Sequence, residues 1–545
     1  MKIKNVILLS FILFLMSCYD DKGNYDYSEM AEIKIENLPE TLEILGGIEH
    51  IVAQPKVISS LEGEIKDGNP NFEFSYKLEL KGGSQLYNEA WVDLNPSKSL
   101  NLDTLISIPS GNYVVWFAVK DKRSSIEYST TFDVKVTSST YEGWLVLCNE
   151  GEEERVRMDM ISVISADRIE PAYDLLSLLG LPDLKKATKI GFYPAPVATG
   201  DVIYLMSEEG TYKLNQNTFG TSDMYNIYTT DFIVAPSDPD ESIVEYMPLA
   251  NMGPPTARAI LAATARAIFA VSNKGNVYAL VTAAGAAFEM PINTSVRGKS
   301  PEYRVAPYVG ISMVRYPGNS TAALFYDIDN KRFVGWSFKS PTSNDVNQIL
   351  TPVPNPEVGG LFDFKTGMDL VYMEGTRYSN GLVYAILQNA SGKRVIYGIN
   401  MSGTGFVQES KYENLNAPDF DKATVFAFHS QFPYMFYGVG NKVYLHNLGT
   451  NMTYEMKNIN LGANEEVTML KFNLYHNNYW WPEPSEEFMA RQFELMVGTY
   501  DNSVSGVNGG KLGFYKVDGV NNSITKRVEY SGFARIKDVR YRERR

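Results

Sequence analysis

Residues 267–280 read AIFAVSNKGNVYAL: an apolar run, a turn at Asn273-Lys-Gly275, and a second run that ends in Val277-Tyr-Ala-Leu280. Two short apolar runs joined by a glycine-containing turn are typical of a β-hairpin. The same phrase occurs seven times, starting near residues 143, 201, 266, 321, 381, 433 and 493. The spacings of 58, 65, 55, 60, 52 and 60 residues suit blades with long loops, so the sequence predicts a seven-bladed β-propeller.

Further segments with strand-like patterns accompany the hairpins. They are Thr188–Phe192, Gly310–Arg315, Val467–Phe472 and, after the last hairpin, Phe533–Tyr541. We expect the C-terminal strand to pair into the sheet that begins at Trp144, because this pairing would remove two open sheet edges. Residues 173–186 and 255–267 favour helix and are predicted as short helices between blades. A row of separate β-sandwiches, or a β-solenoid, is the alternative to a propeller.

Residues 31–138, ahead of the repeats, predict a β-sandwich, so the expected fold class is all-β throughout. Its clearest alternating strands are Phe72–Leu80, Tyr113–Asp121 and Tyr128–Val136. Tyr113, Trp116 and Val119 are expected in the core. The entry Gly111-Asn-Tyr113, the alternating valines and Asp121 at the strand end resemble the last strands of a PKD domain. The usual Trp-x-Phe-Gly-Asp-Gly signature is missing, so this would be a divergent, PKD-like copy.

The first 17 residues predict a signal peptide. Lys2 and Lys4 precede the apolar run Val6–Met16, which is shorter than the roughly 20 residues that span a bilayer but fits a secretory signal. Leu15-Met16-Ser17-Cys18 resembles a bacterial lipobox, whose cysteine is diacylated and becomes the new N-terminus. Loss of Lys2 and Lys4 would change the net charge from −14 to −16. An ordinary signal peptide that happens to contain a cysteine is the alternative.

Residues 18–30 form a short polar and acidic segment that is expected to act as a tether. Asp20 and Asp21 follow Cys18 closely, with only Tyr19 in between. Acidic residues at this place resemble the export signal that sends lipoproteins of the Bacteroidetes to the outer face of the outer membrane. The resemblance implies a lipid-anchored protein that faces the cell exterior, with a periplasm-facing lipoprotein as the alternative.

Composition excludes several classes of function. A pI near 5.0 argues against nucleic-acid binding, and two cysteines provide no disulfide framework. Motifs of serine hydrolases, zinc proteases, P-loop enzymes and dinucleotide-binding proteins are missing from the sequence. The acidic stretches 238–241 and 327–330 lack the full ligand spacing of a calcium loop. We therefore expect no catalytic motif, no cofactor and no metal site, a buried inert thiol at Cys148, and a structural role for His446.

One stretch between the sixth and seventh hairpins suggests binding. Tyr479, Trp480 and Trp481 are followed by two prolines at 482 and 484, which oppose strand pairing. Two adjacent tryptophans cannot both point inward from a strand, so they suit a loop that displays aromatic rings to a sugar or peptide. The alternative is that the indoles pack on the propeller rim as a lid.

The whole arrangement resembles the PKD-like family lipoproteins of gut and oral Bacteroidetes. The likeness is carried by the lipobox, the segment YDDKGNYDY at 19–27, the sandwich, and the opening Tyr141-Glu-Gly-Trp-Leu-Val-Leu147 of the propeller region 139–545. It implies a SusC-like TonB-dependent transporter and a SusD-like lipoprotein as partners. The implied role is an accessory one in capturing a glycan or oligopeptide at the cell surface. No catalytic residues come with the resemblance.

Two other classes of function stay open at this point. A propeller hydrolase or lyase would use carboxylates at the central channel, and a cluster of carboxylates with a His or Arg there would favour it. An aromatic platform without such a cluster would favour a binding protein. The third possibility is a structural subunit that rests on the transporter and binds no ligand itself.

Overall fold

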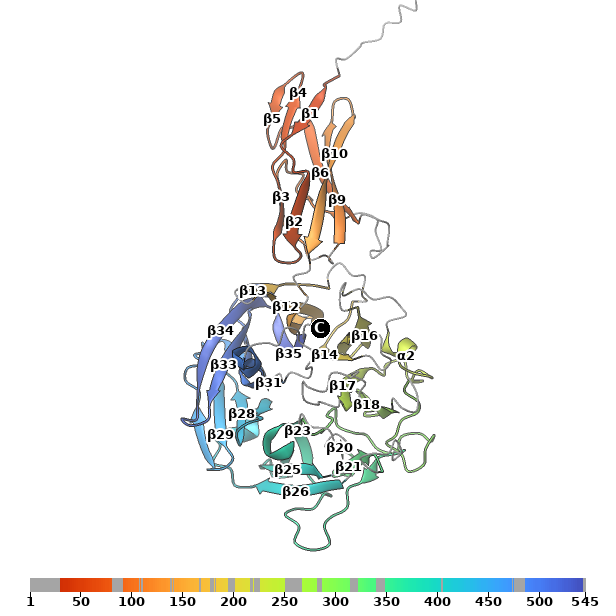
Figure 1. Cartoon of the computed structure of the whole chain (residues 1–545), viewed down its shortest axis with the longest axis vertical. Helices are drawn as coiled ribbons and strands as arrows, with labels where there is room; N and C mark the ends of the chain where they lie inside the picture. The colour runs from red at the N-terminus through yellow and green to blue at the C-terminus, as the bar shows by residue number, and fades with distance from the viewer. Residues whose placement is uncertain are drawn as a thin grey trace, which may run out of the picture.

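The computed structural model describes residues 30–80, 92–106, 108, 111–137, 140, 142–165, 168–176, 181, 183–194, 201–215, 219, 226–249, 267–281, 287–313, 322–339, 348–402, 405–472, 474 and 486–542. These residues form an all-β structure with two parts. A narrow N-terminal domain stands beside a ring of small sheets (Figure 1).

The N-terminal domain is a β-sandwich, as the sequence predicts. Its strands are β1 (Ile33–Glu36), β2 (Thr41–Leu45), β3 (His50–Ala53), β4 (Lys56–Ser59), β5 (Gly63–Ile65), β6 (Phe72–Leu80), β7 (Val92–Asp93), β8 (Leu102–Leu105), β9 (Gly111–Asp121) and β10 (Glu127–Thr137). The larger sheet has the order β2-β10-β9-β6-β7, and the smaller ones are β1-β4-β5 and β3-β8. One apolar core is shared by strands of all three sheets.

Strand β9 shows how the core of this domain is filled. Tyr113, Val115, Phe117 and Val119 are at most 1% exposed, while Trp116 is 40% exposed. Successive side chains of a strand point to opposite faces, so the face that buries Tyr113 must turn Trp116 outward. The prediction is therefore confirmed for Tyr113 and Val119 and wrong for Trp116.

The second part contains seven sheets, numbered here in chain order. Sheet 1 is β13 (Arg168–Ala172), β12 (Arg155–Ser165), β11 (Gly143–Glu150) and β35 (Arg535–Arg542), and sheet 2 is β14 (Ala187–Pro194), β15 (Asp201–Ser207) and β16 (Gly210–Leu214). Sheet 3 is β17 (Ile243–Leu249), β18 (Ala267–Ser272) and β19 (Val277–Val281), and sheet 4 is β20 (Ala322–Asp327), β21 (Arg332–Ser337) and β22 (Thr351–Pro352).

The remaining three sheets have four strands each. Sheet 5 is β23 (Asp369–Gly375), β24 (Val383–Gln388), β25 (Arg394–Ser402) and β26 (Gly405–Tyr412), and sheet 6 is β27 (Val425–Phe428), β28 (Tyr434–Val439), β29 (Lys442–Asn447) and β30 (Met452–Glu455). Sheet 7 is β31 (Glu465–Phe472), β32 (Leu495–Asp501), β33 (Gly510–Asp518) and β34 (Ser523–Phe533). Figure 1 shows the seven sheets following one another around a common centre, which is a β-propeller-like arrangement.

Apolar clusters join each sheet to the next. The middle strands are buried on both faces, as in β18 (AIFAVS) and β24 (VYAILQ), because a neighbouring sheet covers each face. Seven separate clusters link consecutive sheets, and one of them joins sheet 7 to sheet 1. In that cluster Trp144 packs against Phe514 and Tyr541, with ring centroids 5.0 and 4.9 Å apart.

The two ends of the ring also meet within one sheet. Strand β35 pairs antiparallel with β11, placing Trp144 opposite Tyr541. This pairing confirms the prediction for the C-terminal strand. Sheet 1 therefore combines strands from both ends of the repeat region.

Two other predictions about this region need correction. Residues 173–176, 181 and 183–186 contain no helix. Leu175 N donates to Met158 O and Val156 N donates to Leu184 O, both at 2.8 Å, and the leucines pack into the apolar cluster between sheets 1 and 2 from irregular chain. The predicted strand Gly310–Arg315 is reduced, over its described residues 310–313, to one bridge between Gly310 and Leu324. The predicted helix 255–267 falls almost entirely outside the described residues.

The N-terminal domain contacts the ring through the turn between β2 and β3. Ile48 packs against the apolar cluster between sheets 1 and 2. Next to it, Arg168 of β13 donates to Glu49 at 3.0 Å. A side chain in an apolar cluster and an ion pair therefore connect the two parts.

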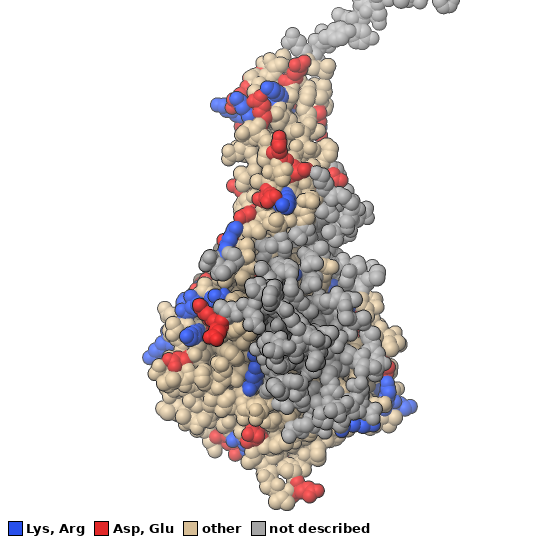
Figure 2. All heavy atoms as spheres, viewed as in Figure 1, with Lys and Arg blue, Asp and Glu red and all other residues tan. Residues whose placement is uncertain are grey.

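The described surface carries both signs of charge. On the face in Figure 2, Lys and Arg lie interspersed with Asp and Glu. Within the described residues, none of the helices has the length and apolar character needed to cross a membrane.

Candidate functional site

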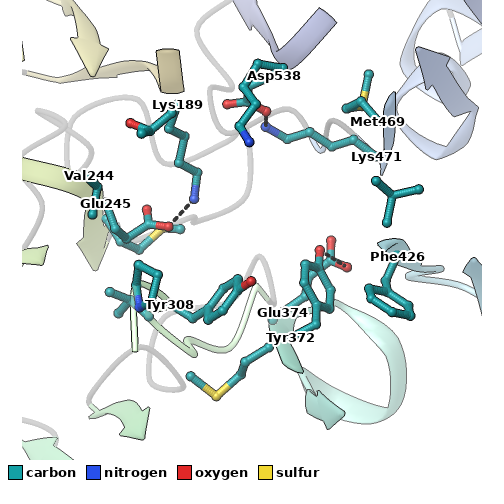
Figure 3. A pocket seen from close by; sticks show the side chains of 18 of the residues that line it. Lys189, Val244, Glu245, Tyr308, Tyr372, Glu374, Phe426, Met469, Lys471 and Asp538 are labelled. Carbon is teal, nitrogen blue, oxygen red and sulfur yellow. Dashed lines mark hydrogen bonds and ion pairs between the residues drawn. The ribbon is translucent and has the colours of Figure 1, made fainter. Parts of the chain in front are cut away.

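A cavity of about 990 Å³ lies where the sheets face one another. Its walls come from one strand of each of six sheets: β14, β17, β23, β27, β31 and β35. In the fourth sheet, residues 304–309 take this place beside β20. Figure 3 shows that the labelled side chains point from different strands toward a common space. The arrangement brings together residues as distant in sequence as Thr188 and Arg540.

Two ion pairs on the cavity wall connect neighbouring sheets. Lys189 of β14 pairs with Glu245 of β17, and Lys471 of β31 pairs with Asp538 of β35, the latter with Nζ 2.6 Å from Oδ1 (Figure 3). The second oxygen of Asp538 accepts a hydrogen bond from the Ile190 amide at 3.0 Å. Asp538 thus holds sheets 7, 1 and 2 together. Burial raises the pKa of Glu245 and lowers that of Lys471, because it penalises both charged forms.

A third carboxyl group, Glu374 of β23, has neutral partners. Its Oε2 accepts hydrogen bonds from the Phe428 amide at 2.9 Å and from the Tyr372 hydroxyl at 3.1 Å. Burial raises the pKa of Glu374 to about 7, against the opposing effect of these two donors and of the more distant charges of Lys471 and Lys189. Near neutral pH, Glu374 therefore changes readily between carboxylic acid and carboxylate.

Aromatic rings form another part of the wall. Tyr372 lies between Tyr308 and Phe426, with ring centroids 5.5 Å from each. The hydroxyl of Tyr308 donates to the carbonyl of Val371 at 3.3 Å, so this ring is held in place. Below we call Tyr308, Tyr372 and Phe426 the aromatic wall.

The cavity combines the features of a small-molecule binding site. It is concave, has an apolar and aromatic lining, and contains a few fixed charged groups. Arg540 also lies on its wall and donates to the carbonyl of Phe192 at 3.5 Å. The cavity therefore has the carboxylates and the arginine that the sequence analysis expected of a propeller enzyme. It also has an aromatic platform, but the criterion for a binding protein, a platform without such a cluster, is not met.

The site residues that the sequence predicts cannot be placed relative to the cavity. Cys18, Asp20 and Asp21 lie outside the described residues, and so do Tyr479, Trp480 and Trp481. Among the described residues, no group of three or more His, Cys, Asp or Glu side chains could hold a metal ion. The acidic turn at Asp327 is structural, because this carboxylate binds Arg332 at 2.8 Å and the Asn330 amide at 2.9 Å.

Two further expectations concern single residues. Cys148 is fully buried in β11, and burial raises the pKa of its thiol well above the usual value, as expected for an inert cysteine. His446 is also buried, and its Nδ1 lies 2.7 Å from the hydroxyl of Thr453. Burial lowers the pKa of His446 to about 4, which agrees with a structural role.

Sequence reasoning missed all of the charged residues in the cavity. A signal for them is present in the sequence. The cavity strands β14, β17, β23 and β31 carry Lys189, Glu245, Glu374 and Lys471 close to apolar residues, whereas the middle strands β18 and β32 are apolar up to their ends. A charged side chain on a strand of a buried sheet needs a polar environment, and here the cavity provides it.

Comparison with protein families relates the N-terminal part of the chain to one of them. Residues 18–173 match the PKD-like family. The match begins at Cys18 and ends just behind β13, so it includes the sandwich and part of sheet 1. No curated protein matches the chain significantly.

Solved structures with a similar course of the chain are distant in sequence. A quinonprotein alcohol dehydrogenase-like protein from Bacteroides thetaiotaomicron is 11% identical, with 94% of this chain and 100% of that chain covered and a TM-score of 0.44. A protein from Lactobacillus plantarum is also 11% identical, with 74% and 100% covered and a TM-score of 0.41. The Saccharomyces cerevisiae protein Sqt1 is 9% identical, with 64% and 86% covered and a TM-score of 0.32.

Proposed function

We propose that this protein is a bacterial lipoprotein of the outer cell surface that binds an oligopeptide or glycan in its central cavity. In this proposal Cys18 carries the lipid, Asp20 and Asp21 direct export, and the PKD-like sandwich holds the ring above the membrane. The seven sheets are the blades of a closed seven-bladed propeller. The protein acts as an accessory or assembly subunit beside a SusC-like transporter and a SusD-like lipoprotein, in a member of the Bacteroidetes.

The observation that carries the binding part of this proposal is the cavity. Its charged groups come from separate strands, and each is fixed by a hydrogen bond or ion pair rather than free to move. Fixed polar groups beside an aromatic wall reduce the entropy that is lost when a ligand binds. The lipobox and the PKD-like match from Cys18 onward support the surface location.

A hydrolase or lyase is the second candidate, because of Glu374. A carboxyl group with a pKa of about 7 is suited to general acid or base catalysis at neutral pH. The neighbouring Tyr372 hydroxyl would orient it. In that case the protein would cleave the ligand bound in the cavity instead of delivering it intact to the transporter.

One experiment separates binding from catalysis. The mature protein is incubated with mixtures of oligopeptides and oligosaccharides, and the species retained after gel filtration and those left in solution are identified by mass spectrometry. We expect an intact ligand to be retained by the wild type. Val244→Trp, which places a bulky indole on the cavity wall, should weaken or abolish retention, whereas Val520→Trp, at a position that is 87% exposed, should leave it unchanged.

The other outcomes are equally informative. Cleaved products that disappear with Glu374→Gln would establish the enzyme. Retention that Val244→Trp leaves unchanged would place the ligand elsewhere. If the wild-type protein neither retains nor cleaves any ligand, ligand binding is contradicted. The structural subunit is then the remaining function.

A further inference from the structure

The charged groups in the cavity differ in whether they have a partner of opposite charge. Lys189 and Lys471 each have a carboxylate of their own, Glu245 and Asp538. Glu374 takes part in no ion pair with any residue that the structure describes, and the donors that reach it are an amide and a phenol. A carboxylate among neutral donors in a protein interior gains strongly from a cation that enters beside it.

A second carboxylate group in the cavity has an oxygen that can accept a further hydrogen bond. Glu245 is 3% exposed, and its Oε1 accepts no hydrogen bond from any described residue, although Oε2 pairs with Lys189. A buried acceptor without a donor costs roughly 1–3 kcal/mol. In the view of Figure 3, the ring of Tyr308 lies between Glu245 and Glu374. Carboxylate acceptors thus lie on both sides of the Tyr308 ring.

We infer that the cavity selects a ligand that carries a primary ammonium group, which Glu374 binds while the apolar part of the ligand lies on the aromatic wall. This inference rests on the proposed function, since it names the ligand class of the same cavity. An ammonium group has three donors and no acceptor, so it complements a carboxylate whose other partners are neutral donors. The rings of Tyr372 and Phe426 add a cation–π attraction near the same place. Glu245 Oε1 accepts from an N–H or O–H at the far end of the ligand.

Two sources provide this chemistry: the amines of oligopeptides and those of amino-sugar oligosaccharides. Acetylation removes the charge and two of the three donors in either case and leaves the rest of the ligand in place. The pair of amine and acetylated amide therefore tests the inference without any change to the protein.

The experiment measures dissociation constants of the full mature protein by calorimetry at pH 7. The probes are lysine-containing tripeptides with free or acetylated amines, and glucosamine oligosaccharides with free or acetylated amines. We expect at least one free-amine probe to bind about tenfold or more tightly than its acetylated counterpart, because acetylation leaves the buried carboxylate without its cation. Which of the two free-amine probes binds identifies the source.

Variants place the effect at Glu374. Glu374→Gln keeps the shape and a hydrogen-bond acceptor but loses the charge, and we expect it to remove the preference for the free amine. Asp369→Asn, on the same strand but with a side chain 65% exposed, is the matched control and should retain the preference. The preference is the ratio of two affinities measured on the same variant. Small changes in the stability of that variant therefore do not affect it.

The outcomes distinguish the inference from the proposed function. Equal affinity for free and acetylated probes, or a preference that survives Glu374→Gln, would overturn the inference and leave ligand binding intact. If none of the four probes binds and the cavity variant Val244→Trp retains a different ligand as the wild type does, both are overturned.

Discussion

Replacing Cys18 with alanine is expected to abolish labelling of the protein by an alkyne-bearing fatty acid in growing cells. The wild-type chain should be labelled fully, because the lipobox thiol is the proposed attachment site. Two or three acyl chains hold a protein firmly on a bilayer, whereas a chain without them has no such anchor. The protein should therefore also leave the outer-membrane fraction.

The chain contains its own control for this experiment. Cys148 is the second of its two cysteines and is completely buried. Cys148→Ala should keep the label and the membrane location. A labelled Cys18→Ala protein, or a wild type that takes up no label, would show that the N-terminal segment is not a lipoprotein signal.

The second large effect concerns Asp538. Asp538→Ala removes the acceptors of the Lys471 ammonium and of the Ile190 amide, both beside the cavity. Breaking a buried ion pair by removing one partner costs about 3–5 kcal/mol. We expect a loss of this size in the free energy of unfolding, measured by denaturant titration with circular dichroism. The ring domain should show the loss, since Asp538 links sheets 7, 1 and 2.

A surface pair provides the comparison. Asp369 pairs with Lys331 at 2.9 Å, and both side chains are largely exposed, so Asp369→Ala should cost only about 0–1 kcal/mol. The double variant Lys471→Met with Asp538→Leu removes both buried charges and should recover the part of the loss that comes from the unpaired Lys471, while the Ile190 amide still lacks its acceptor. An Asp538→Ala protein as stable as the Asp369→Ala control would show that this pair does not hold the sheets together.

Much of the fold could be predicted because local apolar patterns determine it. The hairpin at 267–280 appears as β18 and β19, and the alternation of Phe72–Leu80 appears as β6 with the same bounds. Pairing of β35 with β11 could be predicted from the cost of open edges. The leucines of 173–186 misled the prediction, because a leucine-rich segment is compatible with helix and with irregular chain whose leucines pack between two sheets.

The candidate site could not be predicted in the same way. Its ion pairs join Lys189 to Glu245 and Lys471 to Asp538, which are 56 and 67 positions apart in sequence. Such pairs depend on how neighbouring sheets are placed around the centre, and no local pattern specifies this. Charged residues next to apolar residues in these strands were the available signal. They indicate that a polar space exists but not which residues meet there.

The most direct test of the central claim is a detergent pull-down of the tagged, full-length protein from native outer membranes, with partners identified by mass spectrometry. The tag is placed behind residue 545, because the N-terminus is needed for the lipid. Cys18→Ala, prepared in the same way, is the control for partners that adhere without membrane location. The account predicts that a SusC-like transporter and a SusD-like lipoprotein are recovered with the wild type and lost with the control. Recovery of the wild-type protein alone would contradict the proposal that it is a stable subunit of an uptake complex.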